Sequence, residues 1–400
     1  MENKNRKNQN HCRYAKQCGG CQYQGIRYKE QLNRKQKYLE GLLGGFAKVL
    51  PVIGMEHPEH YRNKVHHGFT KDRSGNIISG PYEAGSHWII DVDRCLIEDE
   101  KCQEIADTIR DLCRKFHVPI YNEKTGNGVM RRVLIRRGFA SGEIMVVLVV
   151  GGKFTVKKEF ARKLKGRHPE ITTIISNFNE KRTSMILGEK EEVLFGPGFI
   201  RDILCGLTFR ISSKSFYQVN PVQTQILYET AMEYAGLSGQ ETVIDAYCGI
   251  GTIGLTAARK LSGAAGTISH GKIIGVELNP DAVRDAKANA AENGVDNIEF
   301  HCADAGEYMK KMAATGQHAD VVFMDPPRAG STIQFMKAVL KMQPDRIVYI
   351  SCGPESLVRN LKFFTENGYQ CQRIQPVDMF PYTEHVETCA LLTKASVSEA

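Results

Sequence analysis

One cysteine, Cys352, lies at a position where a reactive group is expected. It directly follows an apolar run, residues 347–351, that is typical of a buried parallel strand, and a helix is expected to begin near Glu355. A buried cysteine is usually an inert small hydrophobe. At a strand end just ahead of a helix, however, amide dipoles are expected to lower the thiol pKa from about 8.5. The position favours a nucleophilic cysteine.

Such a thiolate suits methylation at carbon 5 of a pyrimidine. That carbon is too electron-poor to take a methyl group directly, but thiolate addition to carbon 6 converts the ring into an enolate whose carbon 5 is nucleophilic. A base must then remove the C5 proton so that the thiol can leave. The segment 377–387 offers Glu384 and Glu387, with His385 between them, and spacing alone leaves the choice of base open.

A further acid, Asp325, closes the candidate strand 320–325 and is followed by two prolines that make the backbone rigid. Open parallel sheets bind their ligands at this edge. An Asp-Pro-Pro followed by an aromatic residue is typical of enzymes that methylate exocyclic amines. Arg328 stands at that place here, which argues against amine chemistry.

The cofactor site is predicted at an earlier turn. A strand, residues 242–246, runs into Gly249 and Gly251, where a ligand can approach the backbone closely. Glu277 ends the next strand and can accept hydrogen bonds from both ribose hydroxyls, and Asp304 closes the third strand. Acids at three successive strand ends favour the adenosine of S-adenosylmethionine over a dinucleotide.

The side chains beside this turn are expected to differ in role. We interpret Tyr247 as a wall of the cofactor pocket and Cys248 as packing within the turn. No Lys-Ser or Lys-Thr pair follows the glycines, so a phosphate-gripping loop is not expected.

These motifs require an α/β fold in which strands and helices alternate. From residue 242 onward the pattern predicts a mainly parallel, doubly wound, Rossmann-like sheet. Its expected strands are 242–246, 272–277, 298–304, 320–325 and 346–351. We divide the chain into an N-terminal cysteine-cluster segment (1–50), a central mixed α/β domain (51–205) and a catalytic domain (206–395).

Composition narrows the setting. The 400 residues include 53 Lys and Arg against 45 Asp and Glu, a net charge of +8 that favours an anionic partner such as nucleic acid. The basic segments 61–67 and 131–137 are candidates for phosphate contacts. Neither a signal peptide nor a membrane span is recognised, so a cytoplasmic protein with reduced cysteines is expected, without membrane contact or an obligatory protein partner.

Six motifs together resemble the RNA uracil-C5 methyltransferase family of the RumA and TrmA type, over almost the whole chain. They are residues 216–220, 245–251, 275–277, 325–330, 351–352 and 378–387. The resemblance implies Cys352 as nucleophile and Glu387 as the proton-abstracting base. It also implies that Gln218, Tyr247, Glu277 and Asp325 surround the cofactor and the target base.

The resemblance has two departures. The family usually carries Asn after the catalytic cysteine and Thr three residues further on, where this chain has Gly353 and Ser356, so local hydrogen bonding is expected to differ. Many members also carry an N-terminal TRAM barrel. Only eleven residues precede Cys12, so RNA is expected to be held by the central and catalytic domains.

A second group of cysteines is expected to bind metal. Cys12, Cys18 and Cys21 cluster on a glycine turn, and no second Cys-x2-Cys pair follows nearby to complete a zinc ribbon. The candidates for a fourth ligand are Cys95, Cys102 and Cys113. The spacing resembles the [4Fe-4S]-binding members of the family, and Cys95, followed by Leu-Ile, fits their fourth ligand; structural zinc is the alternative.

The cluster also bears on the substrate, because the family's ribosomal RNA branches carry it while its bacterial tRNA branch lacks it. We therefore expect methylation of a 23S rRNA uridine. A tRNA loop uridine is the first alternative, and a non-catalytic RNA-binding or ribosome assembly protein the second. Cytosine methylation usually places its cysteine beside a proline in a different motif, which Ser351-Cys352-Gly353-Pro354 fits imperfectly.

Overall fold

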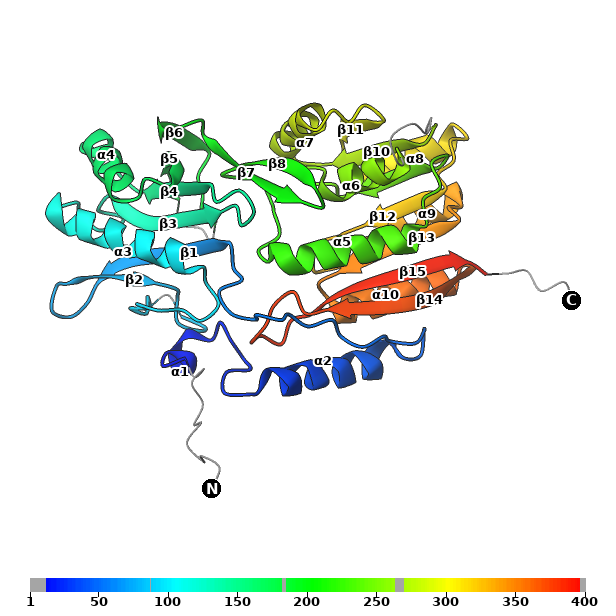
Figure 1. Cartoon of the computed structure of the whole chain (residues 1–400), viewed down its shortest axis with the longest axis horizontal. Coiled ribbons are helices and arrows are strands. Elements are labelled where there is room, and N and C mark those ends of the chain that lie inside the picture. The colour runs from blue at the N-terminus through cyan, green and yellow to red at the C-terminus, as the bar shows by residue number, and fades with distance from the viewer. Residues whose placement is uncertain (1–11, 87, 182–184, 263–269, 396–400) are drawn as a thin grey trace, which may run out of the picture.

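The chain builds two sheets that stand side by side and are connected by a hairpin (Figure 1). The computed structural model describes residues 12–86, 88–181, 185–262 and 270–395. The helices of this part are α1 (Ala15–Cys18), α2 (Tyr28–Leu43), α3 (Glu100–Lys115), α4 (Lys157–Arg167), α5 (Pro221–Ala235), α6 (Thr252–Leu261), α7 (Pro280–Glu292), α8 (Ala305–Ala314), α9 (Ile333–Met342) and α10 (Pro354–Thr365).

The C-terminal sheet has seven strands in the order β11-β10-β9-β12-β13-β15-β14. Strands β9 to β13 run parallel, and β15 runs antiparallel to both of its neighbours. The strands are β9 (Thr242–Ala246), β10 (Lys272–Glu277), β11 (Ile298–Cys302), β12 (Val321–Met324), β13 (Arg346–Ser351), β14 (Tyr369–Val377) and β15 (Glu387–Lys394). The predicted Rossmann-like sheet is confirmed.

Helices cover both faces of this sheet because successive strand side chains point to opposite sides. In β12, Val321 and Phe323 join the core formed with α5, α6 and α7, while Val322 and Met324 join the core formed with α8, α9 and α10. All four side chains are fully buried. The continuous apolar runs in the sequence are thus the mark of a sheet that is buried on both faces.

The N-terminal helix α2 also packs on the catalytic sheet, since Leu39 and Leu43 are buried in the same core as α10. Its Lys35 Nζ lies 2.6 Å from Oδ1 of Asp378, and both side chains are fully buried. Tyr28 donates a hydrogen bond from its hydroxyl to the other carboxylate oxygen, at 2.9 Å. The loop before β15 is therefore held in place from the N-terminal helix.

The central sheet has six strands in the order β2-β1-β3-β4-β5-β6. Helices α3 and α4 cover one face, and the other faces the core shared with the catalytic domain. The strands are β1 (Lys64–Lys71), β2 (Ile77–Gly80), β3 (Met130–Arg137), β4 (Ile144–Val150), β5 (Ile171–Phe178) and β6 (Lys190–Phe195). The hairpin β7 (Phe199–Leu204) and β8 (Leu207–Ser212) leads from this sheet into the catalytic domain, as Figure 1 shows.

No helix within the described ranges is long and apolar enough to span a bilayer.

Candidate active site

Three ionisable side chains meet at the carboxyl edge of the catalytic sheet. Asp325 follows β12 and Cys352 follows β13, while Glu387 is the first residue of β15. In the antiparallel pairing of β13 with β15, Ser351 lies opposite Thr388. Cys352, the residue after Ser351, therefore lies beside Glu387, the residue before Thr388. The antiparallel strand therefore returns a carboxylic acid to the edge where the parallel strands deliver the thiol.

Both carboxyl groups lie in surroundings that disfavour their charged forms. Burial, followed by the negative charge of Asp325, raises the pKa of Glu387 to about 8. Burial alone raises the pKa of Asp325 to about 7. The Oε2 atom of Glu387 is buried without a hydrogen-bond partner among the described residues. An acid with such a pKa can exchange a proton at neutral pH, as a general base or acid must.

The expectation that the helix dipole lowers the pKa of Cys352 is wrong. Helix α10 does begin two residues later, at Pro354. Burial nevertheless raises the thiol pKa to about 11, and the charges of Glu387 and Asp325 add to the shift. A desolvated thiol beside two acids is kept neutral in the free protein because its thiolate would face both burial and like charge.

The predicted cofactor turn has a left-handed backbone, as its glycines suggested. Tyr247, Gly249 and Gly251 all adopt positive φ, at 65°, 54° and 83°. The amide of Gly249 donates to Glu277 Oε2 at 3.0 Å, and the amide of Asn279 donates to the other oxygen at 2.8 Å. The carboxylate that is expected to meet ribose hydroxyls is thus fixed at the end of β10.

The remaining predicted cofactor residues lie around this edge in different ways. Asp304 is exposed and caps α8, where its Oδ1 accepts from the amide of Glu307 at 3.0 Å. Gln218 is 8% exposed, and its backbone carbonyl oxygen accepts a hydrogen bond from Asn63 Nδ2 at 3.1 Å. The Tyr247 ring packs near Phe335, with ring centroids 5.2 Å apart.

One acid of the motif 245–251 was counted in the sequence among the strand-end acids but was given no role of its own. Asp245, in β9, is fully buried, and burial raises its pKa to about 8. Its Oδ2 accepts from the amide of Gly254 at 2.7 Å, whereas Oδ1 has no partner among the described residues. An acid inside an otherwise apolar strand, Val243 to Ala246, was the signal that could have identified it.

The four candidate cluster cysteines gather beneath the loop before β15. Cys21 and Cys95 pack on the same small apolar cluster, which includes Tyr61 and Tyr382. Burial raises the pKa of Cys21 to about 11, and the neighbouring thiols of Cys18 and Cys12 add to the shift. Burial also raises the pKa of the Cys95 thiol, and the charges of Glu98 and Cys21 add to the shift.

The other two candidates for the fourth ligand lie elsewhere. Cys102 and Cys113 are fully buried in the core under α3. Within the described ranges, no group of three His, Cys, Asp or Glu side chains is arranged to hold a metal ion. The thiols are therefore assembled in one region without converging on a single point.

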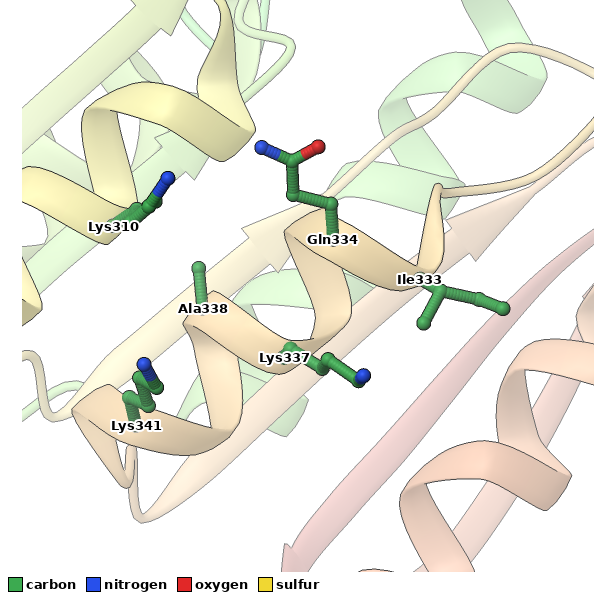
Figure 2. Close-up of a pocket in the computed structure, with 6 residues that line it drawn as sticks. All are labelled: Lys310, Ile333, Gln334, Lys337, Ala338 and Lys341. Carbon is green, nitrogen blue, oxygen red and sulfur yellow. The ribbon is translucent and has the colours of Figure 1, made fainter.

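A hollow of about 400 Å³ lies between α8 and α9 (Figure 2). Three lysines contribute to its lining, and Figure 2 shows Lys337 and Lys341 on successive turns of α9 with Lys310 across from them. None of the predicted catalytic or cofactor residues lines it. It is thus separate from the carboxyl edge that carries Cys352.

The fold and this edge define the class of protein. A Rossmann-like sheet with a glycine turn after its first strand is the fold of S-adenosylmethionine-dependent methyltransferases. Residues 188–395 match the model of the tRNA (Uracil-5-)-methyltransferase family. The chain belongs to this family and is an RNA methyltransferase.

Relatives of the same family align over nearly the whole chain. An RNA methyltransferase of Halalkalibacterium halodurans is 42% identical over 387 residues, which cover 95% of this chain and 82% of the relative. One from Clostridium tetani is also 42% identical, covering 96% and 82%. A crystal structure of Pyrococcus abyssi tRNA (uracil-54, C5)-methyltransferase in complex with S-adenosyl-L-homocysteine is 27% identical, with a TM-score of 0.77, covering 94% and 86%.

Proposed function

We propose that this protein transfers a methyl group from S-adenosylmethionine to carbon 5 of a uridine in 23S rRNA. The observation that carries the proposal is the meeting of Cys352, Glu387 and Asp325 at the carboxyl edge of the sheet. A cysteine beside two neutralisable acids supplies what C5 methylation needs, namely a nucleophile for carbon 6 and a base for the C5 proton.

The proposed reaction divides these roles between two side chains. Cys352 gives its proton to solvent and its sulfur bonds to carbon 6, and the electron pair of the C5–C6 double bond moves towards the uracil carbonyl oxygen as an enolate, which makes carbon 5 nucleophilic. After carbon 5 has gained the methyl group, Glu387 takes the C5 proton and the C6–S bond breaks, so that the cysteine leaves as a thiolate. Because Glu387 has a pKa near 8 in its buried site, it can hold this proton and release it to solvent in each cycle.

The residues of the glycine turn fit S-adenosylmethionine, which supplies the methyl group as an electrophile when bound. Glu277 is fixed by two backbone amides and presents its carboxylate where ribose hydroxyls would bind. A Cβ atom added at Gly249 would meet no atom within 4 Å, so the backbone there borders open space. We assign Tyr247, Asp304 and Gly251 to the same pocket, and Gln218 and Asp325 to its border with the target base.

A tRNA uridine is the second candidate substrate. It is favoured by the P. abyssi enzyme, which shares the fold at a TM-score of 0.77 and acts on uracil 54 of tRNA. We prefer 23S rRNA because Cys12, Cys18, Cys21 and Cys95 gather in one region, and a cysteine cluster is the mark of the ribosomal RNA branches.

Deleting the gene and measuring nucleosides in separated rRNA and tRNA by mass spectrometry tests the substrate. We expect 5-methyluridine to disappear from one position in 23S rRNA and to return when the intact gene is restored. Loss from tRNA alone would establish the second candidate. No loss from either RNA would contradict the proposed reaction.

We further propose that the four thiols hold a [4Fe-4S] cluster. They lie in a partly apolar region beside Arg62, whose Nε is buried without a hydrogen-bond partner among the described residues, so an anionic group fits there. Four cysteine thiolates are the usual ligand set of a [4Fe-4S] cluster.

Purification without oxygen is expected to yield a coloured protein with roughly four irons and four sulfides per chain. Replacing Cys95 with serine should remove most of this iron, because a hydroxyl is a poor substitute for a thiolate ligand. Iron and sulfide content and visible absorbance are the measurements. The exposed Cys302, replaced in the same way, is the matched control. Full iron content in Cys95→Ser would rule out this fourth ligand, and zinc in place of iron would rule out the cluster.

A further inference from the structure

The basic residues of the two central strands β1 and β3 divide into two sets according to the face of the sheet. On the face toward α3, three basic side chains have acidic partners, whereas Lys71 at the end of β1 is exposed. His67 lies 3.0 Å from Glu98, and Arg137 lies 2.8 Å from Asp99. Arg131, on the same strand, is bound by Glu123 at 2.8 Å. These residues serve the fold.

The opposite face carries Arg132, which lies 3.5 Å from Glu123, and a second set for which no acidic partner is found among the described residues. The register pairs Lys64 with Arg136 and His66 with Leu134, so these side chains share one face. Leu134 lies in the core shared with the catalytic domain, which identifies the face as the one toward that domain. Among the described residues, neither Lys64 nor His66 makes a side-chain hydrogen bond or ion pair, and the buried Nε2 of His66 has no partner.

Arg136 is the most deeply buried member of this group. Its side chain is fully buried, and within the described part of the chain it donates only to backbone carbonyls, those of Ser212 at 3.4 Å and Ser215 at 3.0 Å. The turn that it holds leads directly into Gln218. A positive charge without a carboxylate partner is therefore built into the wall between the two domains.

The charges repel one another in the free protein. Burial, followed by the positive charges of Arg136 and Arg62, lowers the pKa of Lys64 to about 8. Burial, followed by the positive charges of Lys64 and Arg136, lowers the pKa of His66 to about 3. Lys64 and Arg136 lie opposite each other on the paired strands, with no carboxylate partner among the described residues, which indicates a place for an anion that comes from outside the chain.

The group continues toward the nucleophile. Arg62 lies close enough to His385 for its charge to help lower the pKa of that histidine, although burial and Arg328 contribute more. The Arg328 guanidinium lies 3.3 Å from Nδ1 of His385, at the edge that carries Cys352. Positive groups thus extend from the central sheet to the active site.

We propose that Lys64 binds a backbone phosphate of the RNA strand that leads to the target uridine. The Lys64 side chain is only partly buried, so its ammonium group can meet a strand from outside the chain, whereas the buried Arg136 adds positive potential beside it. Phosphate contacts of this kind position the strand and do not select a sequence. The inference rests on the proposed function, because it places the RNA at the edge that holds Cys352.

The test compares Lys64→Met with Lys71→Met, which removes an exposed lysine at the far end of the same strand. A fluorescent single-stranded oligouridine is the probe, and its affinity is measured by anisotropy over a series of salt concentrations. Each lost phosphate contact is expected to reduce the slope of log affinity against log salt by about 0.7. We expect this reduction in Lys64→Met, the wild-type slope in Lys71→Met, and a largely restored slope in Lys64→Arg.

Two further readouts separate the possible failures. A melting temperature that falls in Lys64→Met while the slope stays at the wild-type value would assign Lys64 a structural role and overturn the proposal. Methyl transfer from S-adenosylmethionine to RNA from the deletion strain is measured on the same samples. If the wild-type protein transfers no methyl group while the slopes differ as expected, the proposed reaction fails and the phosphate site stands.

Discussion

Replacing Cys352 with alanine is expected to abolish methyl transfer, with a loss on the order of 10⁴-fold or more, because no other group at the edge can add to carbon 6. The measurement is transfer of a labelled methyl group to RNA isolated from cells that lack the gene. Binding of S-adenosylmethionine should be retained, since the glycine turn follows β9 and does not depend on the thiol.

Cys302→Ala is the matched control for this substitution. That cysteine is exposed at the end of β11, so its loss should leave activity unchanged. Activity within tenfold of wild type in Cys352→Ala would show that the reaction proceeds without a covalent bond to this residue and would overturn the proposed mechanism.

Replacing Glu387 with glutamine is expected to stop the reaction after the methyl group has been transferred. The amide cannot take the C5 proton, so the C6–S bond persists and turnover falls by about 10²–10⁴-fold. A protein–RNA adduct that survives denaturing electrophoresis and carries the labelled methyl group is the expected product.

Glu384→Gln separates the two candidate bases that spacing alone left open. Glu384 is exposed, whereas Glu387 is 3% exposed and lies beside the thiol. We expect normal turnover and no lasting adduct in Glu384→Gln. An adduct in this variant, with normal turnover in Glu387→Gln, would reverse the assignment.

The catalytic sheet could be predicted because its strands are fully buried. A parallel sheet covered on both faces demands continuous apolar runs, and β9, β10 and β13 have the bounds expected from the sequence. The helix after Asn279 likewise begins at Pro280, where a proline at the first turn costs no hydrogen bond.

The electrostatics of the site could not be predicted in the same way. The raised thiol pKa of Cys352 depends on Glu387, which reaches it only through the antiparallel pairing of β13 with β15. The two basic segments looked alike in the sequence, yet among the described residues Lys64 has no acidic partner, whereas Arg137 meets Asp99. Such differences depend on contacts between segments far apart in the chain.

The buried pair of Lys35 and Asp378 joins residues that are 343 positions apart. During synthesis the lysine leaves the ribosome long before its partner, and domains fold as they emerge. Burying the lysine alone would cost about 3–5 kcal/mol, so α2 has no stable place on the sheet until the last loop has been made. An incomplete chain is therefore expected to remain open at its N-terminal segment and exposed to proteases, so only full-length protein presents a finished site to RNA.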